Sequence, residues 1–231
     1  MAQSYSVQVE NLKFGYPDSN KELLDISELK LPKGAHLFIE GASGSGKTTL
    51  LNILAGVQKG QQGSVELLGQ DIIGLSTKRL DRLRADHMGV IFQLFNLIPY
   101  LSVIENILLP CSFSKLRTER VLQENDSLEA AAVDLCLALG LADLDLKRHK
   151  AIDLSVGQQQ RVAAARALIG APEIIIADEP TSALDAVNTK QFMELLLQQC
   201  QQHSSSLIFV SHDTALKTYF DRSISLNELS I

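Results

Sequence analysis

A glycine-rich turn, GASGSGKT at residues 41–48, constrains this chain more than any other stretch of its sequence. The preceding run AHLFIE is typical of a buried strand, and the following run TTLLNILAG is typical of a helix that ends near Gly56. Glycines allow backbone N–H groups to curve around phosphate oxygens without Cβ clashes. The pattern G-x-x-x-x-G-K-[ST] between a strand and a helix therefore predicts a P-loop, which binds the phosphates of a nucleotide.

The P-loop pattern also gives roles to its side chains. We expect Lys47 to reach the β and γ phosphates, and the Thr48 hydroxyl to ligate Mg²⁺. The residues that we expect around the nucleotide are Gly41, Ser43, Gly44, Ser45, Gly46, Lys47, Thr48 and Thr49.

A P-loop needs an acidic partner at the end of a neighbouring strand, and the run EIIIADE at residues 173–179 provides one. Ligands in open α/β sheets bind at the carboxyl ends of the strands. We expect Asp178 to hold Mg²⁺, through water, and Glu179 to polarise the water that attacks the γ-phosphate.

Two further apolar runs end in polar side chains of the same kind. His212 follows LIFVS and is a candidate to contact the γ-phosphate or to orient the attacking water. Gln93 follows MGVIF, and its neutral amide is a candidate Mg²⁺ ligand or a contact of the attacking water.

The order of the patterns predicts an α/β fold. The run at 6–14 alternates as an antiparallel strand does, the run at 63–72 reads as one short strand, and residues 78–86 read as a surface helix. Strands at 173–178, 206–213 and 222–226, with a helix at 186–202, favour a mostly parallel sheet with covered faces. Between them, about 94–153, apolar residues recur at helical spacing, which predicts an inserted helical lobe.

A second stretch suited to phosphate is LSVGQQQRVAAARAL at residues 154–168. Ser155 is a good N-cap, and the alanine-rich run after Arg161 favours a helix. The N-terminus of a helix presents free N–H groups and a positive dipole end to an anion. The sequence therefore predicts two phosphate-seeking features, far apart along the chain.

Composition narrows the class of protein. The formal net charge is −6 and the chain has no dense Lys/Arg run, so we expect no nucleic-acid partner. Three widely spaced cysteines without a C-x-x-C pair indicate reduced thiols in a cytosolic protein. We find neither a signal peptide nor a segment apolar enough to span a bilayer, so we expect any membrane role to come through a partner.

Together these stretches resemble the motifs of the ATP-binding (nucleotide-binding) subunits of ABC transporters. GASGSGKT resembles Walker A, IIIADEP resembles Walker B, and LSVGQ resembles the LSGGQ signature. Gln93 and His212 match the Q-loop and H-loop of that family, and Asp185 matches its D-loop. Tyr16 matches the A-loop aromatic, whose ring stacks on adenine. The resemblance covers essentially the whole chain.

The resemblance implies a P-loop cassette with a mostly parallel sheet, an antiparallel β edge and an inserted helical subdomain. One domain would span 1–231, with an α/β core at 1–93 and 154–231 and the helical subdomain at about 94–153. Two copies would sandwich two ATP molecules head to tail, with Mg²⁺ as cofactor. Ser155, Gly157 and Gln158 would then contact the ATP held by the other copy, which explains the second phosphate-seeking feature.

The run FNLIPYLSVIENILLP most resembles the lipoprotein-releasing, macrolide-efflux and cell-division subgroup. In the family, this region meets an integral membrane permease, so we expect part of Phe95–Tyr100 to form an exposed apolar patch, with the subunit at the inner face of the cell membrane. Two other hypotheses are a soluble ABC ATPase that remodels a non-transport complex and a P-loop kinase for small molecules. The apolar run disfavours the first, and the signature disfavours the second.

Two positions depart from the family pattern. Val156 replaces a signature glycine, which would strain the backbone if that position needed a positive φ. Ala151 stands where many relatives have proline, which predicts a more mobile loop before the signature.

Overall fold

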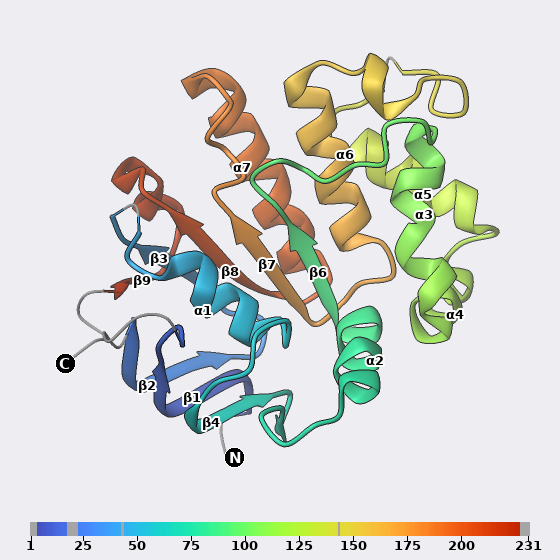
Figure 1. The fold of residues 1–231 in the computed structure, drawn as a ribbon. Helices are drawn as coiled ribbons and strands as arrows, with labels where there is room; N and C mark the ends of the chain where they lie inside the picture. Colours follow the sequence, from blue (N-terminus) through green and yellow to red (C-terminus); the bar gives the residue numbers. More distant parts are fainter. Residues whose placement is uncertain (1–3, 18–22, 43, 143, 227–231) are drawn as a thin grey trace. The chain divides into compact units, whose positions relative to one another are not determined.

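The computed structural model describes residues 4–17, 23–42, 44–142 and 144–226 (Figure 1). Its internal contacts divide the chain into two compact units, one formed by residues 1–84 and 206–231 and the other by residues 85–205. These limits differ from those expected for the helical subdomain, so the predicted subdomain boundaries stay a prediction.

An antiparallel sheet begins the first unit. Its strands are β1 (Tyr5–Phe14), β2 (Leu24–Pro32), β4 (Gln62–Leu67) and β5 (Gln70–Asp71), in the order β2-β1-β4-β5. The alternation that predicts an antiparallel strand at 6–14 is confirmed, because β1 pairs antiparallel with β2 and with β4.

The segment at 63–72 is a hairpin, so the prediction of one short strand is wrong. Leu67 pairs with Gln70, and the two residues between them, Leu68 and Gly69, have φ values of 54° and 82°. Two consecutive left-handed residues are characteristic of a type I′ turn. Leucine is an unusual first residue for that turn, so the sequence gives no Asn-Gly or Asp-Gly signal.

Three parallel strands form the other sheet element of the first unit, in the order β8-β3-β9 (Figure 1). They are β3 (His36–Glu40), β8 (Ser206–Ser211) and β9 (Arg222–Ser225). β3 pairs with β8 from His36↔Leu207 to Glu40↔Ser211. Every residue of β8 is buried, as expected for a strand covered on both faces.

Helix α1 (Lys47–Leu54) follows the glycine turn directly. Most of its residues are buried, including Leu50, Leu51 and Leu54, so little of its surface faces solvent. It ends at Ala55, and Gly56 follows with φ 65°, the left-handed residue that closes many helices. The other helical elements that lie wholly or mostly in the first unit are α2 (Thr77–His87) and the 3₁₀ helix η2 (Thr214–Tyr219).

The second unit has a parallel strand pair and five α-helices in its described residues. The strands are β6 (Met88–Ile91) and β7 (Ile174–Asp178), which pair from Met88↔Ile174 to Ile91↔Ala177. The helices are α3 (Val103–Phe113), α4 (Lys115–Glu124), α5 (Leu128–Ala138), α6 (Val156–Leu168) and α7 (Ala186–Gln202). The predicted helix at 186–202 is confirmed residue for residue.

The helices of this unit begin at residues that the sequence marks as caps. The hydroxyl oxygens of Ser102, Ser114 and Ser127 accept backbone N–H bonds at the starts of α3, α4 and α5. Gly140, with φ 73°, follows the end of α5, as a left-handed residue does at many helix ends. The caps explain why the segment breaks into several short helices instead of one long one.

Candidate active site

The glycine turn between β3 and α1 has the shape of a phosphate cradle. Gly44 and Gly46 take φ values of 79° and 94°, which a residue with a Cβ rarely adopts. Lys47 is buried, and its Nζ donates to the carbonyl oxygens of Gly41 (2.6 Å) and Ala42 (2.9 Å). Its charge is therefore held against the loop.

Ser45 adds a polar atom that the protein does not satisfy. Its Oγ is buried and makes no hydrogen bond among the described residues. A buried hydroxyl without a partner indicates a missing ligand, and beside Lys47 an anionic one fits. Ser43 lies outside the described residues, and Thr48 is exposed at the start of α1.

Tyr16 lies beside this loop, as the resemblance implies. Its hydroxyl and the Thr49 Oγ1 are 3.1 Å apart, within hydrogen-bond distance. Its ring meets Phe14 edge to face at 5.1 Å and remains 46% exposed. An exposed aromatic ring fixed from its edge is suited to stack on a base.

His212 leaves the parallel strands next to the P-loop. Glu40 pairs with Ser211, so the residues that follow them, Gly41 and His212, emerge at the same edge of the first unit. The turn after His212 is fixed because Asp213 accepts a hydrogen bond from Ala215 N–H (3.0 Å). The register of β3 with β8 therefore places His212 close to the start of the glycine turn.

The second unit brings the other strand-end residues together in the same way. Ile91 pairs with Ala177, so Gln93 and the acidic pair Asp178 and Glu179 follow neighbouring strand ends. Gln93 is exposed, whereas Glu179 is only 9% exposed. Glu179 has φ 47°, an uncommon conformation for a residue other than glycine.

The signature segment forms the N-terminus of α6. Ser155 is the N-cap, and its Oγ accepts from Gln158 N–H (3.3 Å) while Gln158 Oε1 accepts from Ser155 N–H (2.9 Å). This capping box occupies the Gln158 side chain, which we expected to contact ATP. Gly157 has room for a Cβ, whose nearest neighbour would be Leu184 at 3.8 Å. Gly157 is half-buried and lines a hollow together with Ser155.

The structure shows the backbone environment of Val156 and Ala151, the two residues that depart from the family pattern. Val156 is the first residue of α6 and is not among the residues with positive φ, so its β-branched side chain brings no such strain. Ala151 N–H donates to Leu101 O (3.1 Å), a bond that proline cannot make. The expected loosening of this loop is thus opposed by a hydrogen bond.

Asp185 caps α7. Its carboxylate accepts from the backbone N–H and from the side-chain Nδ2 of Asn188, both at 2.8 Å, and these bonds lower the pKa of Asp185. An acidic residue just before a helical run is the sequence signal for this structural role.

Arg166, on α6, is a site residue that the sequence patterns do not reveal. It donates to the carbonyl oxygens of Phe95 (2.5 Å) and Asn96 (2.6 Å), two residues with positive φ. Burial lowers the pKa of Arg166. α6 is thereby tied to the segment that follows Gln93. Only the tertiary structure shows this tie, because its acceptors are backbone atoms about 70 residues away in sequence.

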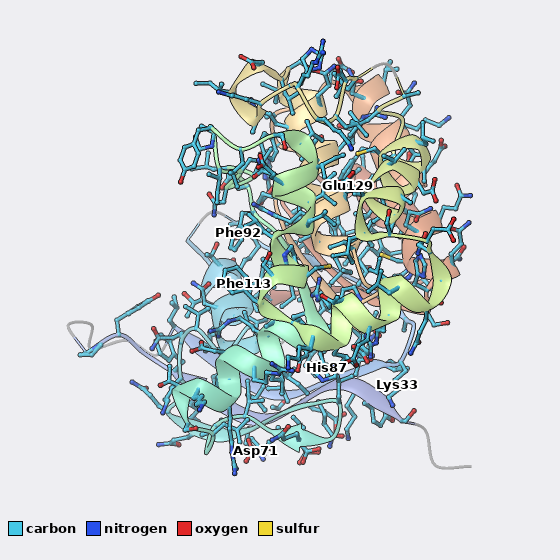
Figure 2. The ribbon with its side chains drawn as sticks, turned by 90° about the vertical axis from the view of Figure 1, so that its right-hand side faces the viewer. Lys33, Asp71, His87, Phe92, Phe113 and Glu129 are labelled. Carbon is cyan, nitrogen blue, oxygen red and sulfur yellow. The ribbon has the colours of Figure 1, made fainter. Side chains whose placement is uncertain are left out.

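The apolar run after Gln93 is partly buried and partly exposed: among Phe95, Leu97, Ile98 and Tyr100, only Tyr100 is exposed. The docking patch expected within Phe95–Tyr100 stays a prediction. Phe95 is buried, whereas Leu94 and Tyr100 are 82% and 73% exposed. Phe92 and Phe113 are also exposed, and Figure 2 shows both on the side of the second unit along which α3 runs. We call Phe92, Leu94 and Tyr100 the Q-loop apolar surface.

Comparison with known proteins identifies the family. The sequence model of the family described as "ABC transporter" matches residues 24–182 of this chain. The chain belongs to this family. It is 37% identical over 224 residues to the lipoprotein-releasing system ATP-binding protein LolD of Hydrogenovibrio crunogenus, covering 96% of this chain and 94% of LolD. It is 35% identical to the macrolide export ATP-binding/permease protein MacB of Pasteurella multocida, covering 96% of this chain and 33% of MacB.

The fold comparison agrees with the family. A dimeric post-hydrolysis structure of the ATP-binding cassette MJ0796, bound to ADP and Pi, superposes with a TM-score of 0.81 at 32% identity. The match covers 95% of this chain and 93% of that cassette. This chain is therefore an ABC cassette with the P-loop fold, of the class of ATP-binding subunits that serve ABC transporters.

Two kinds of feature are absent from the parts of the chain that the structure describes. In those parts of the cassette no helix has the length and apolar character needed to cross a membrane. No group of three or more His, Cys, Asp or Glu side chains that could hold a metal ion occurs among them either. Mg²⁺ in nucleotide sites takes only one or two protein ligands and otherwise binds phosphates and water, so the Thr48 hydroxyl and the Asp178 carboxylate fit that donor chemistry.

Proposed function

We propose that this cassette hydrolyses ATP in a Mg²⁺-dependent reaction, as a homodimer, and that hydrolysis drives an integral membrane permease. The observation that carries the proposal is the cradle of Lys47 and the unpartnered Ser45 hydroxyl, in a chain of the ABC transporter family. Lys47 and the loop N–H groups bind the phosphates, and Tyr16 supports the adenine.

The catalytic step uses the side chains at the strand ends. Glu179 polarises the attacking water, Gln93 and His212 orient it, and Thr48 and Asp178 hold Mg²⁺, which neutralises phosphate charge when bound. The low exposure of Glu179 supports this role, because a carboxylate shielded from bulk water can hold one water molecule in a fixed orientation.

A second copy completes the site in this proposal. The N-terminus of α6, with Ser155 and Gly157, caps the γ-phosphate bound by the other copy. Ser155 and Gly157 line a hollow of 220 Å³ together with Arg161 and Asn188, and this hollow supports an anionic contact here. The dimeric cassette bound to ADP and Pi supports the assembly.

The membrane partner is supported by the Q-loop apolar surface and by the relatives. LolD is named as part of a lipoprotein-releasing system, and MacB as an ATP-binding/permease protein. Exposed apolar side chains beside a site residue suit a protein partner. We place the cassette on the cytoplasmic face of the membrane, bound through this surface.

The Glu179→Gln variant tests the proposal. An amide cannot accept the proton of the attacking water, so we expect ATP turnover to fall at least about 100-fold while ATP binding is retained. With saturating ATP the variant should elute as a dimer in size-exclusion chromatography with light scattering. Glu129→Gln, at an exposed glutamate of α5 bound to Lys147, is the matched control and should keep wild-type turnover. Wild-type turnover by Glu179→Gln would contradict the proposed role.

A further inference from the structure

Gln160, on α6, is a fully buried polar residue next to the catalytic loop. Its Nε2 donates to Pro180 O at 2.6 Å, and the side chain has no solvent exposure. Pro180 directly follows Glu179, so this hydrogen bond fixes the carbonyl next to the proposed catalytic carboxylate. The motifs considered above give Gln160 no role.

The loop that Gln160 contacts holds Glu179 in an unfavourable backbone conformation. Glu179 has φ 47°, and such strain persists only where the surrounding structure fixes it. Ser182 N–H donates to Glu179 O (3.2 Å) and Leu184 N–H donates to Thr181 O (3.1 Å), but both bonds lie within the loop. Gln160 supplies a bond from a different element, a helix of more than three turns.

The buried amide of Gln160 contributes less to the stability of the fold than an apolar side chain of the same size would. Its Oε1 is buried and makes no hydrogen bond among the described residues. A buried unpaired acceptor destabilises the folded state, whereas an apolar side chain of similar size does not. Stability alone therefore favours leucine at this position, and the amide points to another role.

We propose that Gln160 is a positioning residue for Glu179, and that through it α6 connects the phosphate cap at Ser155 to the catalytic carboxylate of the same chain. The inference rests on the proposed function. Ser155 and Gln160 are five residues apart on one helix, roughly 7 Å along its axis. A displacement of the cap by the other copy's ATP therefore moves the donor that holds Pro180.

The Gln160→Leu variant tests the role of the bond. It keeps the volume, removes the donor and removes the unpaired acceptor. We expect kcat for ATP to fall about 10- to 100-fold, as for other losses of site geometry, with nucleotide affinity within twofold of wild type and an unchanged or higher melting temperature. Gln199→Leu is the control, because Gln199 is another buried glutamine and its amide donates to Gln202 Oε1 (2.8 Å) on the same helix face, away from the loop after β7.

The Gln160→Glu variant gives a pH signature that loss of packing cannot produce. A protonated carboxylic acid can donate to Pro180 O, whereas a carboxylate cannot. Burial raises the pKa of a carboxyl group, so we expect activity relative to wild type to be high at acidic pH and to fall as the pH rises.

The outcomes separate this inference from the proposed function. If wild type does not hydrolyse ATP, the proposed function fails. If wild type hydrolyses ATP and Gln160→Leu keeps its kcat, only the inference is overturned. It is also overturned if Gln160→Leu loses affinity and melting temperature together with kcat, or if Gln160→Glu shows the wild-type pH profile.

Discussion

Several single residues of this cassette combine a bond within the protein with an expected contact to ATP. The Tyr16 hydroxyl is paired with Thr49 while its ring stays exposed. Ser155 caps α6 and also lines the hollow that it shares with Gly157. The internal bond fixes the geometry before the ligand arrives, which reduces the entropy lost on binding.

The Tyr16→Ala variant tests the adenine contact at this scale. Stacking of a base on an aromatic ring contributes about 1–3 kcal/mol, so we expect ATP affinity to fall about 5- to 150-fold. Tyr16→Phe keeps the ring and loses only the pairing with Thr49, so its affinity should stay close to wild type. Titration with a fluorescent ATP analogue measures both. Equal affinity of Tyr16→Ala and wild type would exclude the stack.

At the scale of elements, α6 connects three functional segments of the second unit. Ser155 is at its N-terminus, Gln160 reaches the loop after β7, and Arg166 holds the segment after Gln93. Its C-terminus is held by Arg117 of α4, a buried side chain that donates to Ile169 O (3.1 Å) and to Met88 O. Burial lowers the pKa of Arg117 to about 10, so it remains a cation at neutral pH, which suits a helix C-terminus.

A second link between elements lies at the start of β7. Glu173 accepts from Arg120 of α4 (2.6 Å), and its other carboxylate oxygen is 3.0 Å from His87 Nδ1 at the end of α2. Burial opposes ionisation of Glu173, but these hydrogen bonds outweigh it and lower its pKa to about 2.

The lowered pKa of Glu173 predicts that its contribution to the free energy of unfolding depends on pH. Because the folded pKa is below the unfolded value of about 4.3, the contribution is present above pH 4.3 and is lost as the pH falls toward 2. Glu173→Gln should lower the free energy of unfolding by about 1–2 kcal/mol at pH 7, a value reduced for partial exposure. Urea denaturation at pH 7 and pH 3.5 should show a smaller difference at the lower pH. A difference that grows on acidification would contradict the assignment.

At the scale of the whole molecule, each of the two compact units carries part of the set of motif residues. Tyr16, Lys47 and His212 belong to the first unit, and Glu179 and Ser155 belong to the second. The Q-loop apolar surface also belongs to the second unit. In the proposed function, partner binding and Glu179 therefore belong to the same unit, and we propose this as the physical basis for coupling them.

The double variant Leu94→Glu, Tyr100→Glu tests association with a membrane partner. Charges in place of exposed apolar side chains remove the gain from their burial, so we expect at least about tenfold less cassette in the membrane fraction after expression in its own cell. Its basal ATP turnover should stay near wild type. Leu122→Glu, at an exposed leucine of α4, is the control and should not change the distribution. Unchanged membrane association of the double variant would contradict the proposed docking surface.

Much of the fold and of the site could be predicted from the sequence, because the relevant signals are local. The glycine turn, the cap at Ser155 and the helix at 186–202 each depend on residues close together in the chain. The P-loop geometry follows from its own glycines and lysine. The hairpin at Leu68 carries no such local signal, because leucine rarely adopts the positive φ that its turn requires.

Only the tertiary structure decided which distant groups meet. The bond from Gln160 to Pro180 and the bonds from Arg166 to Phe95 and Asn96 join side chains to backbone carbonyls 20 or more residues away. Every residue carries a carbonyl oxygen, so no sequence pattern marks these acceptors. Likewise, the burial of Phe95 and the exposure of Leu94 follow from packing against other elements, which composition alone cannot resolve. Local sequence therefore determined the glycine turn and the helix caps, whereas the contacts that tie α6 to Pro180 and to Phe95 exist only once the chain has folded.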